Sequence, residues 1–231
     1  LATLSDRPDR FIGLHFFYHP AKNRLVEIIP SSRTSSETIQ SVIQYCGAMG
    51  KVVILCKDRP GFVVNRFFVP WLNEACKLLD EGFGTPAEID NVAKDCFNIG
   101  MGPFELMNLT GPSIALHSTD YLASQLQVER YKGADSLRRL VEEGIQWDLA
   151  GVSGEFSSKD RKEIRNRLLG VVLCIASQIV EEEICAMEDV DRGAKVGLRW
   201  PMGPFELAND LGVDVAHGIA SDYAVLAGFE S

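Results

Sequence analysis

The sequence predicts a mainly α-helical protein that opens with the truncated end of a doubly wound α/β domain. Two tandem homologous helical domains follow it. Three observations lead to this prediction. Strand-like runs occur only in the first 57 residues, amphipathic helical patterns fill the rest, and a block of residues recurs at a constant offset of 101 positions.

The first 57 residues contain two strands, a helix and a third strand. "RFIGLHFF" (10–17) and "NRLVEII" (23–29) are rich in β-branched and aromatic residues, which is typical of strands. The helix over residues 35–50 begins at a serine pair and ends at a glycine. "KVVILC" (51–56) is a short apolar run, so we expect a strand buried on both faces. Four elements are too few for a complete doubly wound domain.

Helical patterns begin after Asp58. Residues 61–82 form one long amphipathic pattern that contains Pro70, where we expect a kink. The next helix has a complete start signal, with a capping box from Thr85 to Glu88. The Gly- and Ser-rich segment 147–158 is interpreted as a linker.

The internal repeat defines the two helical copies. "MGPFEL" occurs at 101–106 and again at 202–207, and the pair Asn-Arg at 65–66 returns at 166–167. Asp90 is matched in the same frame by Asp191, without a gap. We therefore expect three parts: residues 1–57 as the incomplete α/β domain, 58–146 as the first helical copy, and 147–231 as linker and second copy.

Composition excludes several classes of partner. A net charge of −9 over 231 residues argues against nucleic acid or an anionic membrane surface as a general partner. No apolar run reaches the ~18 residues of a membrane span.

Six cysteines without a CxxC pair indicate free thiols in a reducing, cytoplasmic compartment, and no histidine lies at metal-ligand spacing from them. Because the chain begins with Leu1, we expect a fragment or a processed chain.

The glycines of "NIGMGPFEL" are interpreted as a helix start, not as a phosphate-binding loop. No strand precedes Gly100 and Gly102, while Pro103 and Glu105 suit the first turn of a helix. No GxGxxG follows a strand anywhere in the chain. We therefore expect no dinucleotide phosphate site, and no cofactor-binding or metal-binding residue can be identified.

His15 and Glu27 are the candidate catalytic pair. If the first two strands form a hairpin around residues 18–23, these two positions lie opposite each other. A carboxylate bonded to one imidazole nitrogen orients the ring and makes the other nitrogen a better base. A structural cross-strand ion pair explains the spacing equally well, so both interpretations stay open.

Asn65 is a third candidate. Its neutral amide lies near the start of a very apolar helix, where a buried capping role competes with substrate binding. His19 lies in the loop between the strands, where function is often located. His117 and His217 lie in the closing helices of the two copies and have no visible partner in the sequence.

Taken together, "RFIGLHFF…RLVEII", "KDRPGFVVNR" and "MGPFEL" resemble the L-3-hydroxyacyl-CoA dehydrogenase family, from about Asp9 to the end of the chain. The resemblance implies a Rossmann-type NAD domain joined to a helical domain, which some members carry twice. The fold class becomes mainly α: the truncated end of a Rossmann-type α/β domain followed by two tandem homologous helical domains. The family has Asn-Pro after "HFF", whereas this chain has Tyr18-His19-Pro20.

The resemblance also implies a reaction, the NAD-dependent oxidation of the C3 hydroxyl of a 3-hydroxyacyl-CoA. His15 then looks like the catalytic base, Glu27 like its orienting carboxylate and Asn65 like a substrate-binding amide. We expect NAD as cofactor for the full-length protein, an acyl-CoA as substrate, and an inactive chain because the NAD-binding half is missing. The second helical copy is expected to act as an internal pseudo-dimer partner. The alternatives are a non-catalytic structural relative and a dehydrogenase of free hydroxy or sugar acids.

Overall fold

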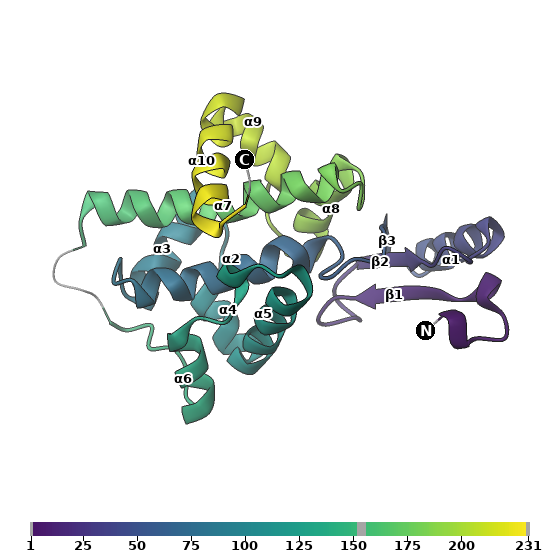
Figure 1. Cartoon of the computed structure of the whole chain (residues 1–231), viewed down its shortest axis with the longest axis horizontal. Coiled ribbons are helices and arrows are strands. Elements are labelled where there is room, and N and C mark those ends of the chain that lie inside the picture. Colours follow the sequence, from purple (N-terminus) through teal and green to yellow (C-terminus); the bar gives the residue numbers. More distant parts are fainter. Residues whose placement is uncertain (1, 152–155, 230–231) are drawn as a thin grey trace.

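The structure is a computed structural model that describes residues 2–151 and 156–229. A small sheet, one α-helix and the N-terminal turns lie at one end of the molecule, and most of the other helices gather at the opposite end (Figure 1). The strands are β1 (Ile12–Phe16), β2 (Leu25–Pro30) and β3 (Val52–Leu55). The α-helices are α1 (Ser36–Ala48), α2 (Val64–Asp80), α3 (Pro86–Phe97), α4 (Pro103–Thr110), α5 (Pro112–Leu126), α6 (Asp135–Glu143), α7 (Ser158–Glu181), α8 (Met187–Gly197), α9 (Pro204–Leu211) and α10 (Val213–Ala227). Short 3-10 helices are η1 (Ala2–Leu4), η2 (Pro8–Arg10) and η3 (Glu129–Tyr131).

The sheet has the order β1-β2-β3, with an antiparallel first pair and a parallel second pair. The predicted hairpin is confirmed, and its register sets His15 opposite Glu27. One face of the sheet packs on α1 through Val26 and Ile28, and the other belongs to the main core. The prediction that the third strand is buried on both faces is wrong, because Leu55 is 42% exposed.

The start of α4 is built by a buried aspartate and a glycine. Asp90 accepts the backbone N–H groups of Phe104 (2.8 Å) and Glu105 (2.9 Å), which have no partner within the helix. A Cβ on Gly102 would lie 2.3 Å from the Asp90 Cγ, so this approach requires glycine. The interpretation of this glycine as a helix start is therefore confirmed.

The second "MGPFEL" segment makes the same contacts. Asp191 accepts the backbone N–H groups of Phe205 (2.8 Å) and Glu206 (3.2 Å) at the start of α9. A Cβ on Gly203 would lie 2.3 Å from the Asp191 Cα. Identical sequence at the same distance from an aspartate thus gives identical local structure.

The helical segments before and after the proposed linker do not form separate cores. One cluster of buried residues extends from Phe17 in the hairpin loop to Tyr223 in α10 and includes both segments. The fold-class prediction of two tandem helical domains is therefore wrong. The two helical segments form one packed body, because the apolar faces of α2 and α7 bury each other. The predicted linker also begins with an anchored residue: Trp147 is buried and exchanges two backbone hydrogen bonds with the Asn108 amide (2.9 and 3.0 Å). Residues 152–155 of that linker lie outside the described residues.

Helix α8 packs directly on the sheet because two of its residues are glycines. A Cβ on Gly193 would lie 3.1 Å from the Ile54 Cδ1 in β3 and 2.6 Å from the Val64 Cγ2 at the start of α2, and one on Gly197 would lie 2.6 Å from the Leu25 Cδ2 in β2. The buried Asn23, in the loop of the hairpin, donates to the Gly197 carbonyl oxygen at 2.8 Å and accepts from the Leu25 N–H at 3.1 Å. The second helical segment thus holds the hairpin that carries His15.

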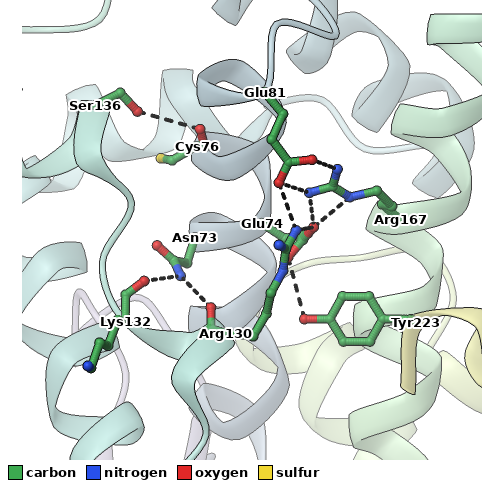
Figure 2. A network of polar contacts seen from close by, with 9 residues as sticks. All are labelled: Asn73, Glu74, Cys76, Glu81, Arg130, Lys132, Ser136, Arg167 and Tyr223. Atoms are coloured by element: carbon green, nitrogen blue, oxygen red, sulfur yellow. Dashed lines mark hydrogen bonds and ion pairs between the residues drawn. The ribbon is translucent and has the colours of Figure 1, made fainter. Parts of the chain in front are cut away.

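Helices α2 and α7 meet along a seam of ion pairs, in which the arginines are buried and their glutamate partners are exposed. Arg66 in α2 pairs with Glu182, just after α7, and Arg167 in α7 pairs with Glu81, just after α2. Arg167 lies 101 positions after Arg66, and Glu182 lies 101 positions after Glu81. The two ion pairs are therefore reciprocal contacts between the two copies of the repeat. Figure 2 shows the Arg167 guanidinium between Glu81 and the buried Glu74.

The Glu74 carboxylate has further partners on that side of the seam. It accepts from Arg130 (2.6 and 3.1 Å) and, at 3.5 Å, from the Tyr223 hydroxyl (Figure 2). Buried charges persist only where they are paired and hydrogen-bonded, so this network depends on both helical segments.

All six cysteines are free thiols, as expected from their spacing. No described helix is long and apolar enough to cross a membrane. Within residues 2–151 and 156–229, no three His, Cys, Asp or Glu side chains gather in a way that could hold a metal ion.

Candidate active site

His15 and Glu27 touch across the hairpin. The His15 Nδ1 lies 2.6 Å from the Glu27 Oε2, and the carboxylate is fully buried while 28% of the imidazole is exposed. An ionised carboxylate accepts hydrogen bonds and cannot donate them, so Nδ1 carries the proton. The other ring nitrogen, Nε2, then has a free lone pair and makes no hydrogen bond to any described residue.

The second oxygen of Glu27 caps α2. Glu27 Oε1 accepts the backbone N–H groups of Val64 (2.9 Å) and Val63 (3.2 Å). A helix N-terminus carries partial positive charge and stabilises a carboxylate there. The buried Glu27 side chain therefore joins the hairpin to α2. The same carboxylate accepts the hydrogen bond that orients His15.

The turn before α2 places an aromatic ring beside His15. Gly61 has φ +78°, and a Cβ there would lie 2.8 Å from the Arg66 Cα, so the turn requires glycine. Phe62 follows with φ 46°, and its ring centroid lies 5.5 Å from that of His15. Phe17 contacts the same imidazole at 4.7 Å. Two apolar rings therefore contact the imidazole and cover part of it, while 28% of the side chain stays exposed.

Asn65 lines a cavity of about 500 Å³ between the turn before α2 and helix α5. Phe62 lines the same cavity and also contacts His15, which is not itself one of the lining residues. The half-buried Asn65 amide makes no hydrogen bond to the described residues. The alternative that Asn65 has a capping role is wrong, because Glu27 occupies the start of α2 and leaves the amide free.

The remaining histidines have different surroundings. His19 forms the hairpin turn, where its Nδ1 accepts from the Ala21 N–H at 3.2 Å. His117, which has no visible partner in the sequence, lines the cavity that contains Asn65. His217 is exposed on α10. The structure thus brings His15 and Glu27 together and sets Asn65 and His117 in one adjoining cavity, while their catalytic and binding roles stay predictions.

Two supporting contacts could not be found from the sequence. Glu27 lies 36 residues from Val63, and Asn23 lies 174 residues from Gly197. No local pattern links such distant positions. The one available signal for Asn23 is an amide directly before an apolar strand, which also fits an ordinary turn.

Comparison with known families gives two matches. The model described as "3-hydroxyacyl-CoA dehydrogenase, NAD binding domain" matches residues 1–59. The model described as "3-hydroxyacyl-CoA dehydrogenase, C-terminal domain" matches residues 61–147 and 164–230. Together the matches extend over most of the chain.

Similar curated proteins carry related names. The chain is 38% identical over 155 residues to a probable 3-hydroxybutyryl-CoA dehydrogenase of Deinococcus radiodurans, covering 67% of this chain and 55% of that protein. It is 37% identical over 148 residues to the human mitochondrial hydroxyacyl-coenzyme A dehydrogenase, covering 62% and 46%. It is 30% identical over 240 residues to the fatty acid oxidation complex subunit alpha of Vibrio parahaemolyticus, covering 92% and 33%. The chain thus spans between a third and about half of the length of these relatives.

Solved structures share the fold. A crystal structure of 3-hydroxybutyryl-CoA dehydrogenase from Escherichia coli matches with a TM-score of 0.84 and 20% identity, over 99% of this chain and 69% of that chain. At this identity the likeness concerns the fold alone. The (S)-3-hydroxybutyryl-CoA dehydrogenase from Ralstonia eutropha is 36% identical with a TM-score of 0.61, over 66% of this chain and 54% of that chain.

These matches correct the rest of the fold-class prediction. We expected residues 1–57 to be the truncated end of a Rossmann-type domain and the NAD-binding half to be missing. This expectation is wrong, because the NAD-binding domain family itself matches residues 1–59. The arrangement of nearly the whole chain is found within one dehydrogenase fold. The prediction relied on the absence of GxGxxG, but the strand pair, helix and third strand belong to the same domain family.

NAD is the cofactor indicated by this domain family and by the homologous dehydrogenases. At the reacting end, His15 presents an Nε2 without a hydrogen bond to any described residue, beside the apolar rings of Phe17 and Phe62. The starts of the two helices that follow strands are already occupied. Ser35 caps α1 and Glu27 caps α2, so neither of these described helix starts is free for the pyrophosphate.

Proposed function

This chain belongs to the 3-hydroxyacyl-CoA dehydrogenase family, and we propose that it provides the base side of an NAD-dependent oxidation of the C3 hydroxyl of a 3-hydroxyacyl-CoA. The observation that supports this most is the buried Glu27, which holds the proton of His15 on Nδ1 and leaves Nε2 free. The substrates are acyl-CoA thioesters of fatty acid oxidation or of 3-hydroxybutyryl-CoA metabolism.

In the proposed reaction His15 Nε2 takes the proton of the C3 hydroxyl. Glu27 stabilises the imidazolium that forms, since its buried carboxylate contacts Nδ1 at 2.6 Å. The free amide of Asn65 donates to the substrate oxygen as it becomes a carbonyl. When bound, NAD⁺ would supply the acceptor for the hydride that leaves C3. His15 then releases its proton to water, which restores the base.

The test is a spectrophotometric assay with 3-hydroxybutyryl-CoA, a longer homologue and the free 3-hydroxy acids as substrates. We expect NADH formation with the thioesters and a loss of at least about 10²-fold in kcat for His15→Gln, the usual contribution of a general base. Oxidation of the free acids in preference to the thioesters would favour a hydroxy-acid dehydrogenase. Unchanged turnover in His15→Gln would rule out the proposed base.

We further propose that the segment after residue 158 is a second copy of the helical unit that acts as an internal dimer partner. In a two-fold symmetric interface, residue i contacts j of the partner and j contacts i. The reciprocal pairs Arg66–Glu182 and Arg167–Glu81 follow this rule within one chain. The paired contacts at Asp90 and Asp191 support the same duplication.

Analytical ultracentrifugation tests the internal partner. Because the α2–α7 face is already covered, we expect a monomer at micromolar concentrations. Arg66→Glu should lower the unfolding midpoint, and the addition of Glu182→Arg should restore part of it. Arg7→Glu, at an exposed pair on the surface, is the control that should leave the midpoint unchanged. A stable dimer at these concentrations would contradict the proposal.

A further inference from the structure

A second cavity, of about 580 Å³, lies where the first helical segment meets the end of α10. Its walls come from the last turn of α2, the segment from η3 to α6, and the last turn of α10. Its charged lining residues are the basic Lys77, Arg130, Lys132 and Arg138 and the acidic Glu129 and Asp135. The lining is thus net positive in a chain whose net charge is −9, and it attracts anionic ligands.

Lys77 is the cation of this lining that makes no ion pair or hydrogen bond with any described residue. Its half-buried side chain extends from the last turn of α2. Burial, and next the charge of Arg130, lower the pKa of Lys77 below its ordinary value. Nearby carboxylates act in the opposite direction without reversing the change, and they belong to Glu74, Asp80 and Asp135. A larger fraction of this amine is therefore neutral, and only the neutral amine is a nucleophile.

The other cations of the cavity differ in how firmly they are held. Arg130 pairs with the buried Glu74 and with Glu81 (Figure 2). Lys132 pairs only with Glu129, three residues before it, and the two side chains are 59% and 82% exposed. Ion pairs as exposed as this one are weak, so the Lys132 ammonium is available to a phosphate group.

The end of α10 gives the cavity an apolar wall. Val225 and Leu226 line it and are 74% and 44% exposed. An acyl-CoA thioester has phosphate groups at one end and an acyl chain at the other, with the reactive carbonyl carbon beside the sulfur. The cavity offers a cation to the first end, an apolar surface to the second and a nucleophile between its walls.

We propose that Lys77 is a site of acylation by acyl-CoA thioesters that bind in this cavity. The neutral Nζ attacks the thioester carbonyl carbon, an amide bond forms and the C–S bond breaks. The proton of the amine passes to the leaving thiolate, so the products are an acylated Lys77 and free coenzyme A, and no oxidant or further reactant is consumed. This reaction goes beyond the proposed oxidation at His15 and requires no hydroxyl group on the acyl chain.

The experiment incubates the protein with acetyl-CoA at pH 8 and follows the acetylation of each lysine by peptide mass spectrometry. Lys77 should react at least about tenfold faster than Lys162, as expected for an amine activated by burial and a neighbouring cation. Lys162 is the matched control, because it is exposed on α7 and makes no ion pair with any described residue.

A second comparison tests the role of the phosphate groups. Lys132→Gln should slow the acetylation of Lys77 by acetyl-CoA about threefold, as expected for the loss of one exposed charge contact. It should leave the rate with S-acetyl-N-acetylcysteamine unchanged, because that thioester has no phosphate group. Lys77→Arg, which keeps the positive charge, should remove the modification at this position.

Acetylation of Lys77 no faster than that of Lys162 would overturn the proposal. An equal loss with both thioesters in Lys132→Gln would overturn the binding of acyl-CoA in this cavity. Acetyl-CoA has no C3 hydroxyl to oxidise, so these results are independent of the dehydrogenase reaction. Rapid acetylation of Lys77 in a protein that does not oxidise 3-hydroxybutyryl-CoA would support this inference and refute the proposed function.

Discussion

Replacing Glu27 tests the central contact of the site without any substrate. Glu27→Gln keeps the shape of the side chain but turns one oxygen into an NH₂ group. The remaining oxygen must accept the N–H groups of Val63 and Val64, so the NH₂ faces His15 Nδ1. Nδ1 then becomes the acceptor and the ring proton moves to Nε2. The variant is expected to fold with an imidazole that can no longer act as a base.

The magnitudes for Gln and Ala at this position differ. Glu27→Gln keeps its hydrogen bonds but loses a charge at a helix start, a loss of about 1–2 kcal/mol in the free energy of unfolding. Glu27→Ala leaves the buried N–H groups of Val63 and Val64 without an acceptor, at about 1–3 kcal/mol each. It also opens a cavity at a fully buried position. We therefore expect a loss of about 3–5 kcal/mol for Ala.

Urea denaturation followed by circular dichroism measures both losses, and ¹⁵N NMR of the imidazole identifies the tautomer. The unaltered protein should have the proton on Nδ1 at neutral pH, and Glu27→Gln should have it on Nε2. In the enzyme assay Glu27→Gln should lose about 10²–10⁴-fold in kcat. A proton on Nε2 in the unaltered protein, or equal stability of the Gln and Ala variants, would refute the reasoning.

Three further predictions concern stability. Gly193→Ala should lower the free energy of unfolding by about 1–3 kcal/mol, because its Cβ meets Val64, whereas Gly218→Ala on α10 has open space and should be neutral or stabilising in the same urea titration. Asn23→Ala should cost about 1–3 kcal/mol by removing the bond to the Gly197 carbonyl; an unchanged midpoint would show that α8 does not hold the hairpin. Burial raises the pKa of Asp90 to about 6. Between about pH 4 and pH 6 the folded protein therefore keeps a proton on this carboxyl that the unfolded chain has already released. Stability from this group is present below about pH 4 and falls by about 1–3 kcal/mol as the pH rises through 6, and Asp90→Asn should flatten that slope.

Much of the local structure could be predicted. The hairpin register that sets His15 opposite Glu27 follows from alternation across a short loop. The capping box at Thr85 follows from side chains three residues apart. Asn65 lines a cavity, as a substrate-binding residue would, but the alternative capping role failed because Glu27 from the hairpin occupies the same helix start.

Spacing along the chain was enough to predict the strands, several helix starts, the recurrence of "MGPFEL" and the pairing of His15 with Glu27. In each case the interacting groups are close along the chain, so their spacing restricts the geometry. The tertiary structure alone decided that Glu27 caps α2, that α8 packs on the sheet and that both helical segments share one core. These contacts join positions tens to more than a hundred residues apart, and many apolar faces could have satisfied the same pattern. Close packing selects one arrangement among them, and the spacing of residues along the chain does not predict which one.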